Sequence, residues 1–211
     1  DRIPVLKTVV LSGRAKMKPV GPLYLPARFR FIHNVGHDYR HYFEVTWFNI
    51  PFLKVNEGYV DGKSFFEAPV IGAEANHPKL SQGANLALWT ETIMFPAALA
   101  LDPRVQWQAV DDETAILTVP FEDSTESIVV RFDPQTALAT TMEVMRYRST
   151  TDEKKTLWIP SSDEYATIDG VTMSVTGSAT WFDQGYAWAS FHTDDVVFNA
   201  PFGDYIRARG E

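Results

Sequence analysis

The chain has 211 residues, of which 45% are hydrophobic and 13% aromatic, and its net charge is −8. So many large apolar side chains exclude a disordered protein, and the length predicts a single domain over residues 1–211. The acidic balance, without any run of Lys or Arg, argues against nucleic acid as a partner, and the absence of cysteine excludes disulfides and thiolate metal sites.

The sequence contains no segment that predicts membrane insertion. No apolar run approaches the roughly 20 residues of a membrane-spanning helix. The chain starts at Asp1 without a signal peptide, so we expect any targeting segment or membrane anchor to lie outside these residues.

In chain order, the first predicted hairpin joins residues 26–34 to residues 39–47, and we expect its register to be centred on His37. That register places aromatic pairs on one face and an ion pair on the other, as cross-strand pairing favours. The pairs that define it are Phe31–Phe43, Phe29–Val45 and Arg30–Glu44.

Two further hairpins turn at Asp61-Gly62 and Asp169-Gly170, a dipeptide that predicts a two-residue turn. After the second of these turns, residues 171–182 alternate between apolar or small side chains and hydroxyl-bearing ones, as in a strand with one buried face. We predict a turn at Asp133–Thr136, and further strands at 6–18, 105–110, 114–119, 126–133, 138–147, 155–161 and 187–198.

Residues 81–99 form the one long stretch with a helical pattern. Ser81 is a good N-cap after the helix-breaking residues 76–78. Pro96 predicts that the helix bends or ends near Phe95, with residues 97–101 as a last turn.

Glu91 lies on this helix among apolar neighbours. At 100° per residue, five apolar residues fall within about 60° of it, whereas Asn85 and Thr92 form a polar stripe on the far side. A carboxylate on an apolar face is costly unless it is paired or protonated, so Glu91 is the best indication of a functional site. The five neighbours are Ala84, Ala87, Leu88, Met94 and Phe95.

The pattern as a whole predicts a mainly β, α+β fold with about ten to twelve antiparallel strands and one main helix, at about 81–99. The helix is hydrophobic over most of its circumference, so it has to be covered on more than one side. A strongly curved sheet that wraps around the helix, a half-barrel, covers it in this way, whereas a flat sandwich leaves it on a rim.

Arg146 is the natural partner for Glu91, because it lies at the end of an apolar strand face. Three interpretations stay open for these two residues. They form a buried ion pair that fixes the helix against the sheet, they are two unrelated side chains whose charged ends reach toward water, or they mark the polar end of an apolar pocket. In the last case, we expect the pocket to be lined by Trp89, Met94, Phe95 and Trp181.

His33, His37 and His41 are spaced by four residues, but the local pattern is strand–turn–strand. We therefore expect His33 and His41 to face each other across the hairpin, with His37 at its tip. A two-histidine metal site needs a further ligand, and no nearby acid except Asp38 supplies one. The sequence thus predicts no metal and no cofactor. It contains neither a nucleophile elbow nor a nucleotide-binding loop, so no catalytic residue is assigned.

Several segments resemble a bacterial family of exported or membrane-anchored proteins without an established activity. The resemblance covers the chain from about residue 55 and is weaker over residues 1–54, where the three histidines lie. The segments are VNEGYVDGKS, LWTETIMFPAALAL, VQWQAVDDETAILTV, VVRFDPQTALATTMEVMRYR and LWIPSSDEYATIDGVTMSVTGSATW, which include Glu91, Arg146 and Tyr165.

The order of strands and helix in this family is similar to that of the LolA/LolB-like lipoprotein-localisation half-barrel. In that fold a curved antiparallel sheet encloses an apolar cavity that is plugged by helices and binds acyl chains. The resemblance implies the same fold and a place in the cell envelope, with the cytoplasm as the alternative. It implies no catalytic residues.

The leading functional hypothesis is a non-enzymatic binding or carrier protein for a hydrophobic or amphiphilic, lipid-like small molecule. Its binding residues would be Glu91, Arg146, Trp89, Met94, Phe95 and Trp181. One alternative is a hydrolase or isomerase for a small apolar substrate, with Glu91 as general base and Arg146 as charge stabiliser. Another is an envelope scaffold that binds a protein partner along its sheet edge.

Overall fold

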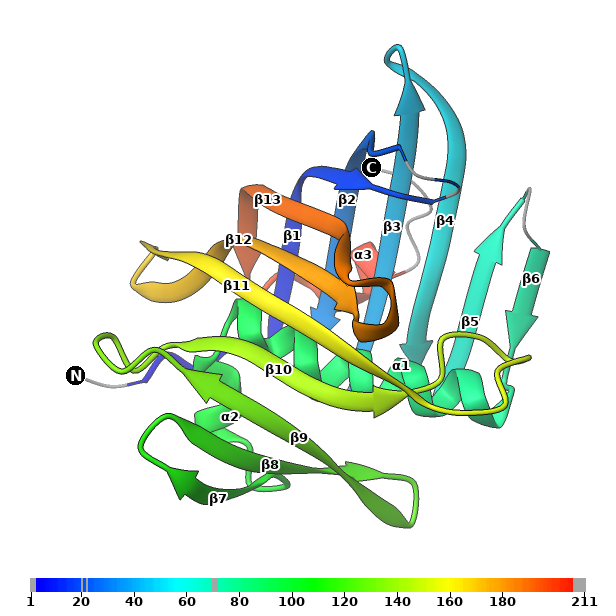
Figure 1. The fold of residues 1–211 in the computed structure, drawn as a ribbon. Coiled ribbons are helices and arrows are strands. Elements are labelled where there is room, and N and C mark those ends of the chain that lie inside the picture. The colour runs from blue at the N-terminus through cyan, green and yellow to red at the C-terminus, as the bar shows by residue number, and fades with distance from the viewer. Residues whose placement is uncertain (1–2, 20, 22, 70–71, 207–211) are drawn as a thin grey trace.

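The computed structural model describes residues 3–19, 21, 23–69 and 72–206. Over these residues, thirteen antiparallel strands form one curved, unclosed sheet (Figure 1). The strands are β1 (Thr8–Met17), β2 (Leu25–Asn34), β3 (Asp38–Trp47), β4 (Ile50–Val60), β5 (Lys63–Ala68), β6 (Gly72–Ala75), β7 (Gln106–Asp111), β8 (Thr114–Phe121), β9 (Ser124–Phe132), β10 (Ala139–Arg146), β11 (Thr156–Ile168), β12 (Val171–Trp181) and β13 (Tyr186–Phe198).

The strand order explains why the helix lies inside the curve of the sheet. The order across the sheet is β6-β5-β4-β3-β2-β1-β13-β12-β11-β10-β9-β8-β7. The chain therefore starts in the middle, meanders outward to β6, and crosses by way of the helices to the opposite edge at β7. It then meanders back until β13 pairs with β1. Helix α1 (Pro78–Thr90) accordingly packs on both halves of the sheet, against β4 and β5 on one side and β8 and β10 on the other.

This architecture confirms the prediction of a mainly β fold with a strongly curved sheet around one main helix. Residues 155–161, expected as one strand, and the residues that lead into the predicted Asp169-Gly170 turn form the single strand β11, because bulges next to Glu164 let the pairing with β12 continue. Strand β6 and the short helix α3 (Phe202–Ile206) were not expected from the sequence.

The predicted turns at Asp61-Gly62 and Asp169-Gly170 are confirmed, and all four residues have the positive φ angles of such tight turns. The predicted register of the first hairpin is wrong. Phe29 pairs with Phe43, Phe31 with His41, and Arg28 with Glu44.

The pairing in this hairpin is centred on Gly36, not on His37. Gly36 has φ = 69°, a left-handed conformation that glycine adopts without steric cost and that closes a three-residue hairpin loop. The partner strand is displaced by two positions from the prediction, so every side chain keeps its expected face.

The helical segment begins earlier than predicted and ends as predicted. Its N-cap is His77, not Ser81: the His77 Nδ1 accepts a hydrogen bond from the Lys79 backbone N–H at 3.2 Å, and Pro78 occupies the first helical position. After Thr90 the chain tightens into the 3₁₀ turn η1 (Glu91–Met94). Phe95 and Pro96 then separate η1 from α2 (Ala97–Leu101).

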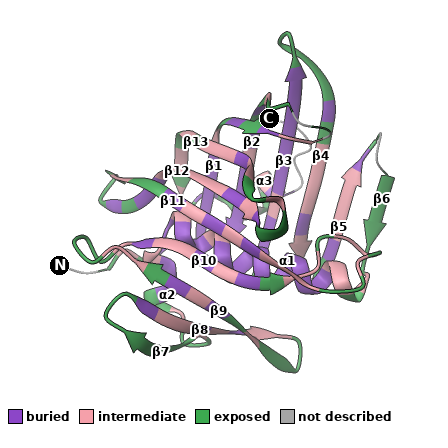
Figure 2. Ribbon diagram, viewed as in Figure 1, coloured by how far each residue is buried: buried purple, intermediate pink, exposed green. Residues whose placement is uncertain are grey.

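Buried residues gather on the helical segment and on the strands around it (Figure 2), and most of them belong to two apolar clusters that both include residues of this segment. One joins α1 to strands β8–β12 through Leu86, Leu88 and Trp89. The other joins Phe95 and Ala98 to the inner faces of β1–β5. Every residue from Ser81 to Thr90 is buried, as expected of a helix covered on several sides. Over the described residues, the helices are too short or too polar to cross a membrane.

The Gly36 turn provides a test of this register. A Cβ at position 36 would collide with the Arg104 Nη2 and lie 2.7 Å from the Asp102 Oδ2. Gly62 has a similar φ of 72°, but its added Cβ would meet no atom within 4 Å. We expect Gly62→Ala to lower the free energy of unfolding by about 1–2 kcal/mol through backbone strain alone. Gly36→Ala should cost up to about 1 kcal/mol more, because the ends of the Arg104 and Asp102 side chains can shift whereas the buried Trp89 Cη2, 3.2 Å from the added Cβ, cannot move freely. Equal losses in chemical denaturation would show that the turn does not pack against Arg104.

Candidate functional site

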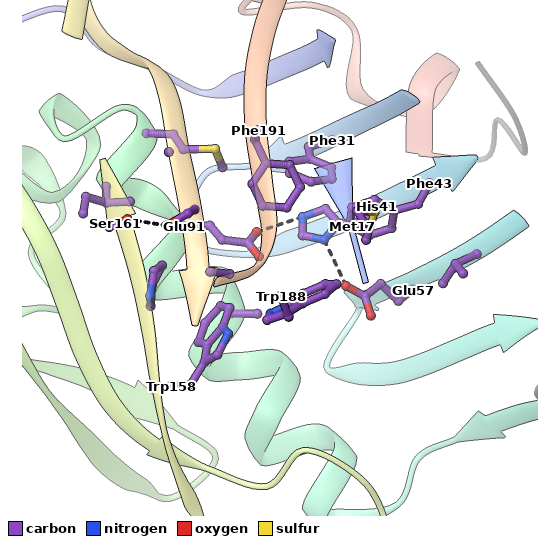
Figure 3. A pocket seen from close by; sticks show the side chains of 18 of the residues that line it. Met17, Phe31, His41, Phe43, Glu57, Glu91, Trp158, Ser161, Trp188 and Phe191 are labelled. Atoms are coloured by element: carbon purple, nitrogen blue, oxygen red, sulfur yellow. Dashed lines mark hydrogen bonds and ion pairs between the residues drawn. The ribbon is translucent and has the colours of Figure 1, made fainter. Parts of the chain in front are cut away.

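A cavity of about 290 Å³ lies between the helical segment and the concave face of the sheet (Figure 3). Most of its wall is apolar, and it draws on β1–β5 on one side and β10–β13 on the other. The helical segment contributes Ala87, Glu91, Ile93 and Met94. Aromatic rings form much of the remaining lining, namely Phe31, Phe43, Phe66, Trp158, Trp181, Trp188 and Phe191.

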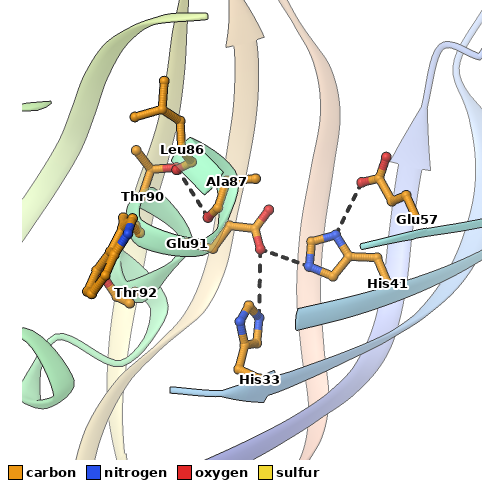
Figure 4. A network of polar contacts seen from close by, with 9 residues as sticks. His33, His41, Glu57, Leu86, Ala87, Thr90, Glu91 and Thr92 are labelled. Atoms are coloured by element: carbon orange, nitrogen blue, oxygen red, sulfur yellow. Dashed lines mark hydrogen bonds and ion pairs between the residues drawn. The ribbon is translucent and has the colours of Figure 1, made fainter. Parts of the chain in front are cut away.

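Of the five ionisable side chains in this apolar wall, four converge: His41, Glu57, Glu91 and Arg146. The fifth, Arg148, pairs with Asp183. His41 lies between the two carboxylates (Figure 4). Its Nε2 is 2.8 Å from the Glu91 Oε2, and its Nδ1 is 3.2 Å from the Glu57 Oε1. The His41 side chain is 1% exposed and that of Glu91 14%, so both groups interact in a largely dry environment.

The sheet register places two of these groups. His41 and Glu57 are direct cross-strand partners on β3 and β4, so their side chains share one face. Glu91 is the first residue of η1, where the α-helix passes into a tighter turn. That change directs its carboxylate at the β2–β3 hairpin. A 3₁₀ segment within a helical run is often found at functional positions.

The electrostatics of the group make His41 a cation at neutral pH. Burial lowers the pKa of His41, but the attraction of Glu91 and the contacts with both carboxylates outweigh this and raise the pKa to about 9. Burial alone would raise the pKa of Glu57, yet the contact with His41 and the charge of Arg146 hold it below its ordinary value. The Glu57 side chain keeps 34% of its surface exposed, so solvent screens part of these interactions.

Arg146 does not pair with Glu91 as the sequence analysis predicted. No ion pair between them is present among the described residues, and Glu91 contacts histidines instead. The Arg146 guanidinium lies 4.5 Å from the ring centre of Trp158 and 5.6 Å from that of Trp181. The negative face of an aromatic ring attracts a cation placed over it, so both tryptophan rings stabilise the charged guanidinium. The Arg146 Nε is buried without a hydrogen-bond partner.

Four of the six predicted binding residues line the cavity: Glu91, Arg146, Met94 and Trp181. Trp89 and Phe95 lie elsewhere, which corrects their predicted place. Trp89 is 2% exposed in the core and its ring faces the Arg104 guanidinium. Phe95 is fully buried and packs edge-on against the His33 ring, at 5.1 Å between ring centres.

His33 and His41 lie together on one face of the hairpin, as expected, although they are diagonal neighbours and not a direct pair. Their ring centres are 5.7 Å apart. His37 is exposed at the turn, and the Asp38 carboxylate accepts hydrogen bonds from the Asn34 side chain and the Asp61 backbone N–H.

The acid that the sequence analysis did not find beside the histidines is Glu91. Its Oε2 lies 3.7 Å from the His33 Nε2 and 2.8 Å from the His41 Nε2. Burial lowers the pKa of His33 well below its ordinary value, and the charge of His41 lowers it further. His33 is therefore neutral beside the charged His41.

Tyr165 is a supporting residue that sequence reasoning did not assign to the site. Its hydroxyl lies 2.9 Å from the Ile93 carbonyl oxygen and 2.8 Å from that of Ala139, and donates to both. These hydrogen bonds connect η1 to β10 through Ile93, which lies two residues after Glu91 in the chain. The only signal for Tyr165 in the sequence was its presence among the residues shared with the resembling family.

The chain matches the DUF6544 family, a family of unknown function, over residues 3–191. No curated protein matches the sequence. Similar solved structures include a domain described as that of an outer membrane lipoprotein-sorting protein from Vibrio parahaemolyticus, with 11% identity, a TM-score of 0.53, and coverage of 92% of this chain and 86% of that one.

Two further structures are similar. A DUF1329 family protein from Desulfovibrio piger has 10% identity and a TM-score of 0.54, and the match covers 96% of this chain and 90% of that one. A LolA superfamily protein from Nitrosomonas europaea has 8% identity and a TM-score of 0.55, with 95% and 89% covered. These likenesses confirm the LolA-like fold expected from the sequence.

The Tyr165 contact can be tested with one substitution at two places. Tyr165→Phe leaves two inward carbonyl groups without their donor, so we expect it to lower the free energy of unfolding by about 1–3 kcal/mol. Tyr24→Phe removes an exposed hydrogen bond to the Ala187 carbonyl, which water can replace, and should change stability by less than about 0.5 kcal/mol. Urea denaturation measures both. If the two variants are equally stable, Tyr165 does not hold η1 in place.

Proposed function

We propose that this chain, which belongs to the DUF6544 family of unknown function, binds or carries an amphiphilic, lipid-like molecule in the cell envelope. The observation that carries this proposal is the cavity itself: a mostly apolar wall inside the curved sheet, with four ionisable groups gathered in one part of it.

The size of the cavity limits the ligand. Pockets that enclose small molecules commonly measure about 300–1,000 Å³, and the volume of about 290 Å³ lies at the lower end. Such a space suits one acyl chain or a compact amphiphile. The aromatic rings of Phe31, Phe43 and Phe191 would contact its apolar part, because burial of apolar surface is the main source of affinity there.

Arg146 is the group best placed to recognise a polar head. Its guanidinium has no ion-pair partner among the described residues, and its Nε is buried without an acceptor. His41, in contrast, is held between Glu57 and Glu91. An anionic head group such as a carboxylate would supply acceptors for Arg146, and charge-assisted hydrogen bonds of this kind are strong.

The structural neighbours support the proposal at the level of fold. One is a domain described as a lipoprotein-sorting protein and another is a LolA superfamily protein. Both share the architecture at 11% identity or less, so the identity of the ligand has to come from experiments on this chain. The same neighbours support the proposed envelope location.

A substitution that fills the cavity tests whether it is the binding site. Val55 lines the cavity on β4, whereas Val110 on β7 is 57% exposed and lies outside it. We expect Val55→Trp to weaken binding of a fluorescent fatty acid to the delipidated protein by about tenfold or more, or about 1.4 kcal/mol, because the indole occupies the space of the acyl chain. Val110→Trp should bind like the wild type. If neither the wild type nor the variants bind the probe, the proposal fails.

The role of Arg146 is tested by changing the head group of the probe. We expect Arg146→Gln to weaken binding of a fatty acid anion by about tenfold or more, since a hydrogen bond to a charged group contributes about 1.5–3 kcal/mol. Binding of the matching fatty alcohol should change little. Arg131→Gln, at an exposed arginine paired with Glu143, is the control. Equal losses for acid and alcohol in isothermal titration would exclude head-group recognition by Arg146.

A further inference from the structure

We propose that His33, His41 and Glu91 form a binding site for a divalent transition-metal ion, with zinc as the ion that best suits these donors. The residues come from β2, β3 and η1, and their side chains meet where the helix crosses the hairpin (Figure 4). The site does not depend on the identity of the ligand proposed above.

The three donor atoms have the spacing that a metal ion requires after a small adjustment. They are the Nε2 atoms of both histidines and the Oε2 of Glu91, and all lie within 4.8 Å of one another. Tetrahedral zinc with bonds of about 2.0–2.2 Å holds its donors roughly 3.3–3.5 Å apart. The distances of 2.8 and 3.7 Å from Glu91 to His41 and His33 lie on either side of that range.

The same three atoms lie inside the protein, and the His33 Nε2 has no hydrogen-bond partner among the described residues. Both histidine side chains are 1% exposed. The His41 Nε2 and the Glu91 Oε2 form an ion pair at 2.8 Å, but the direction of this contact is not that of a good hydrogen bond. The His33 Nε2 lies 3.7 Å from the same oxygen, which is too far for a hydrogen bond. A buried polar atom without a partner is costly, and a metal ion would be a single partner for all three atoms.

Glu57 provides the support that a metal-binding histidine usually has. Its carboxylate lies 3.2 Å from the His41 Nδ1, the nitrogen that faces away from the cluster. A hydrogen bond there keeps the proton on Nδ1, so a metal ion that binds at Nε2 displaces the other proton of the charged imidazole to solvent and takes up the Nε2 lone pair. Glu57 and Glu91 together also offset the two positive charges of the ion.

The donor set indicates which ions fit. Two imidazole nitrogens and one carboxylate oxygen suit zinc or iron(II), whereas calcium and magnesium prefer oxygen ligands throughout. Because His41 and Glu91 line the cavity while His33 lies behind them, a fourth coordination position would face the cavity. Three protein donors with one open position are typical of zinc sites that act on a bound molecule or on water.

The alternative is an ion pair without metal, in which a charged His41 lies between two carboxylates. This arrangement accounts for His41 and Glu57. In this arrangement the buried His33 would donate its Nε2 proton to the Glu91 Oε2, but the 3.7 Å between these two atoms is longer than a hydrogen bond. Metal-binding measurements on the whole chain distinguish the two.

The experiment is titration of the EDTA-treated protein with Zn²⁺ in a calorimeter, and with Co²⁺ followed by visible absorption. We expect one equivalent to bind, the melting temperature to rise with Zn²⁺ and not with Mg²⁺, and a d–d band of a low-coordinate cobalt site to appear. His33→Gln and Glu91→Gln should each weaken Zn²⁺ binding by more than about 100-fold. Glu57→Gln should weaken it by about 10- to 100-fold, as expected of a residue that supports a ligand.

The controls are His37→Ala and His192→Ala, which remove exposed histidines of the same chain and should leave the affinity unchanged. Circular dichroism reports whether each variant is folded, and the wild-type cobalt spectrum decides the question if a variant is not. The proposal is overturned if the wild type binds no stoichiometric Zn²⁺. It is also overturned if binding persists in both Gln variants of the ligands or disappears in His192→Ala.

Discussion

The contact between the Glu91 carboxylate and the His41 imidazole joins the helix to the sheet at the polar part of the cavity. It links η1, which crosses the concave face of the sheet, with strands β3 and β4, which form one wall of the cavity. Because His41 is 1% exposed, removing either partner leaves the other in a poorly solvated environment, and breaking a buried pair of this kind commonly costs about 3–5 kcal/mol. The position of η1, and with it the shape of the cavity, depends on this contact.

The architecture around the contact has a simple physical cause. A helix that is apolar over most of its surface needs cover on several sides, and a meander that leaves one sheet edge and returns from the other supplies it. The helix does not fill the concave face completely, and the remaining space is the cavity. The charged side chains lie where β2–β4, η1 and β10 approach one another. The site therefore consists of residues that are far apart in the sequence.

Much of the fold could be predicted from local patterns, because alternation and turn residues act over a few positions. Asp61-Gly62 and Asp169-Gly170 determine their own registers. The first hairpin was misplaced by two positions because aromatic pairs fit both registers, and only the left-handed Gly36 selects one. Glu91 could be identified from the cost of placing a carboxylate on an apolar face. Its partner could not, because whether His41 or Arg146 reaches it depends on the curvature of the whole sheet.

A double-mutant cycle between His41 and Glu91, measured as free energies of unfolding of the EDTA-treated protein, tests this account most directly. The variants are His41→Gln, Glu91→Gln and the double substitution. The account predicts that the two single losses do not add, with a coupling free energy of about 1–3 kcal/mol. Losses that add to within about 0.5 kcal/mol would contradict it, because the two side chains would then not depend on each other in the folded protein.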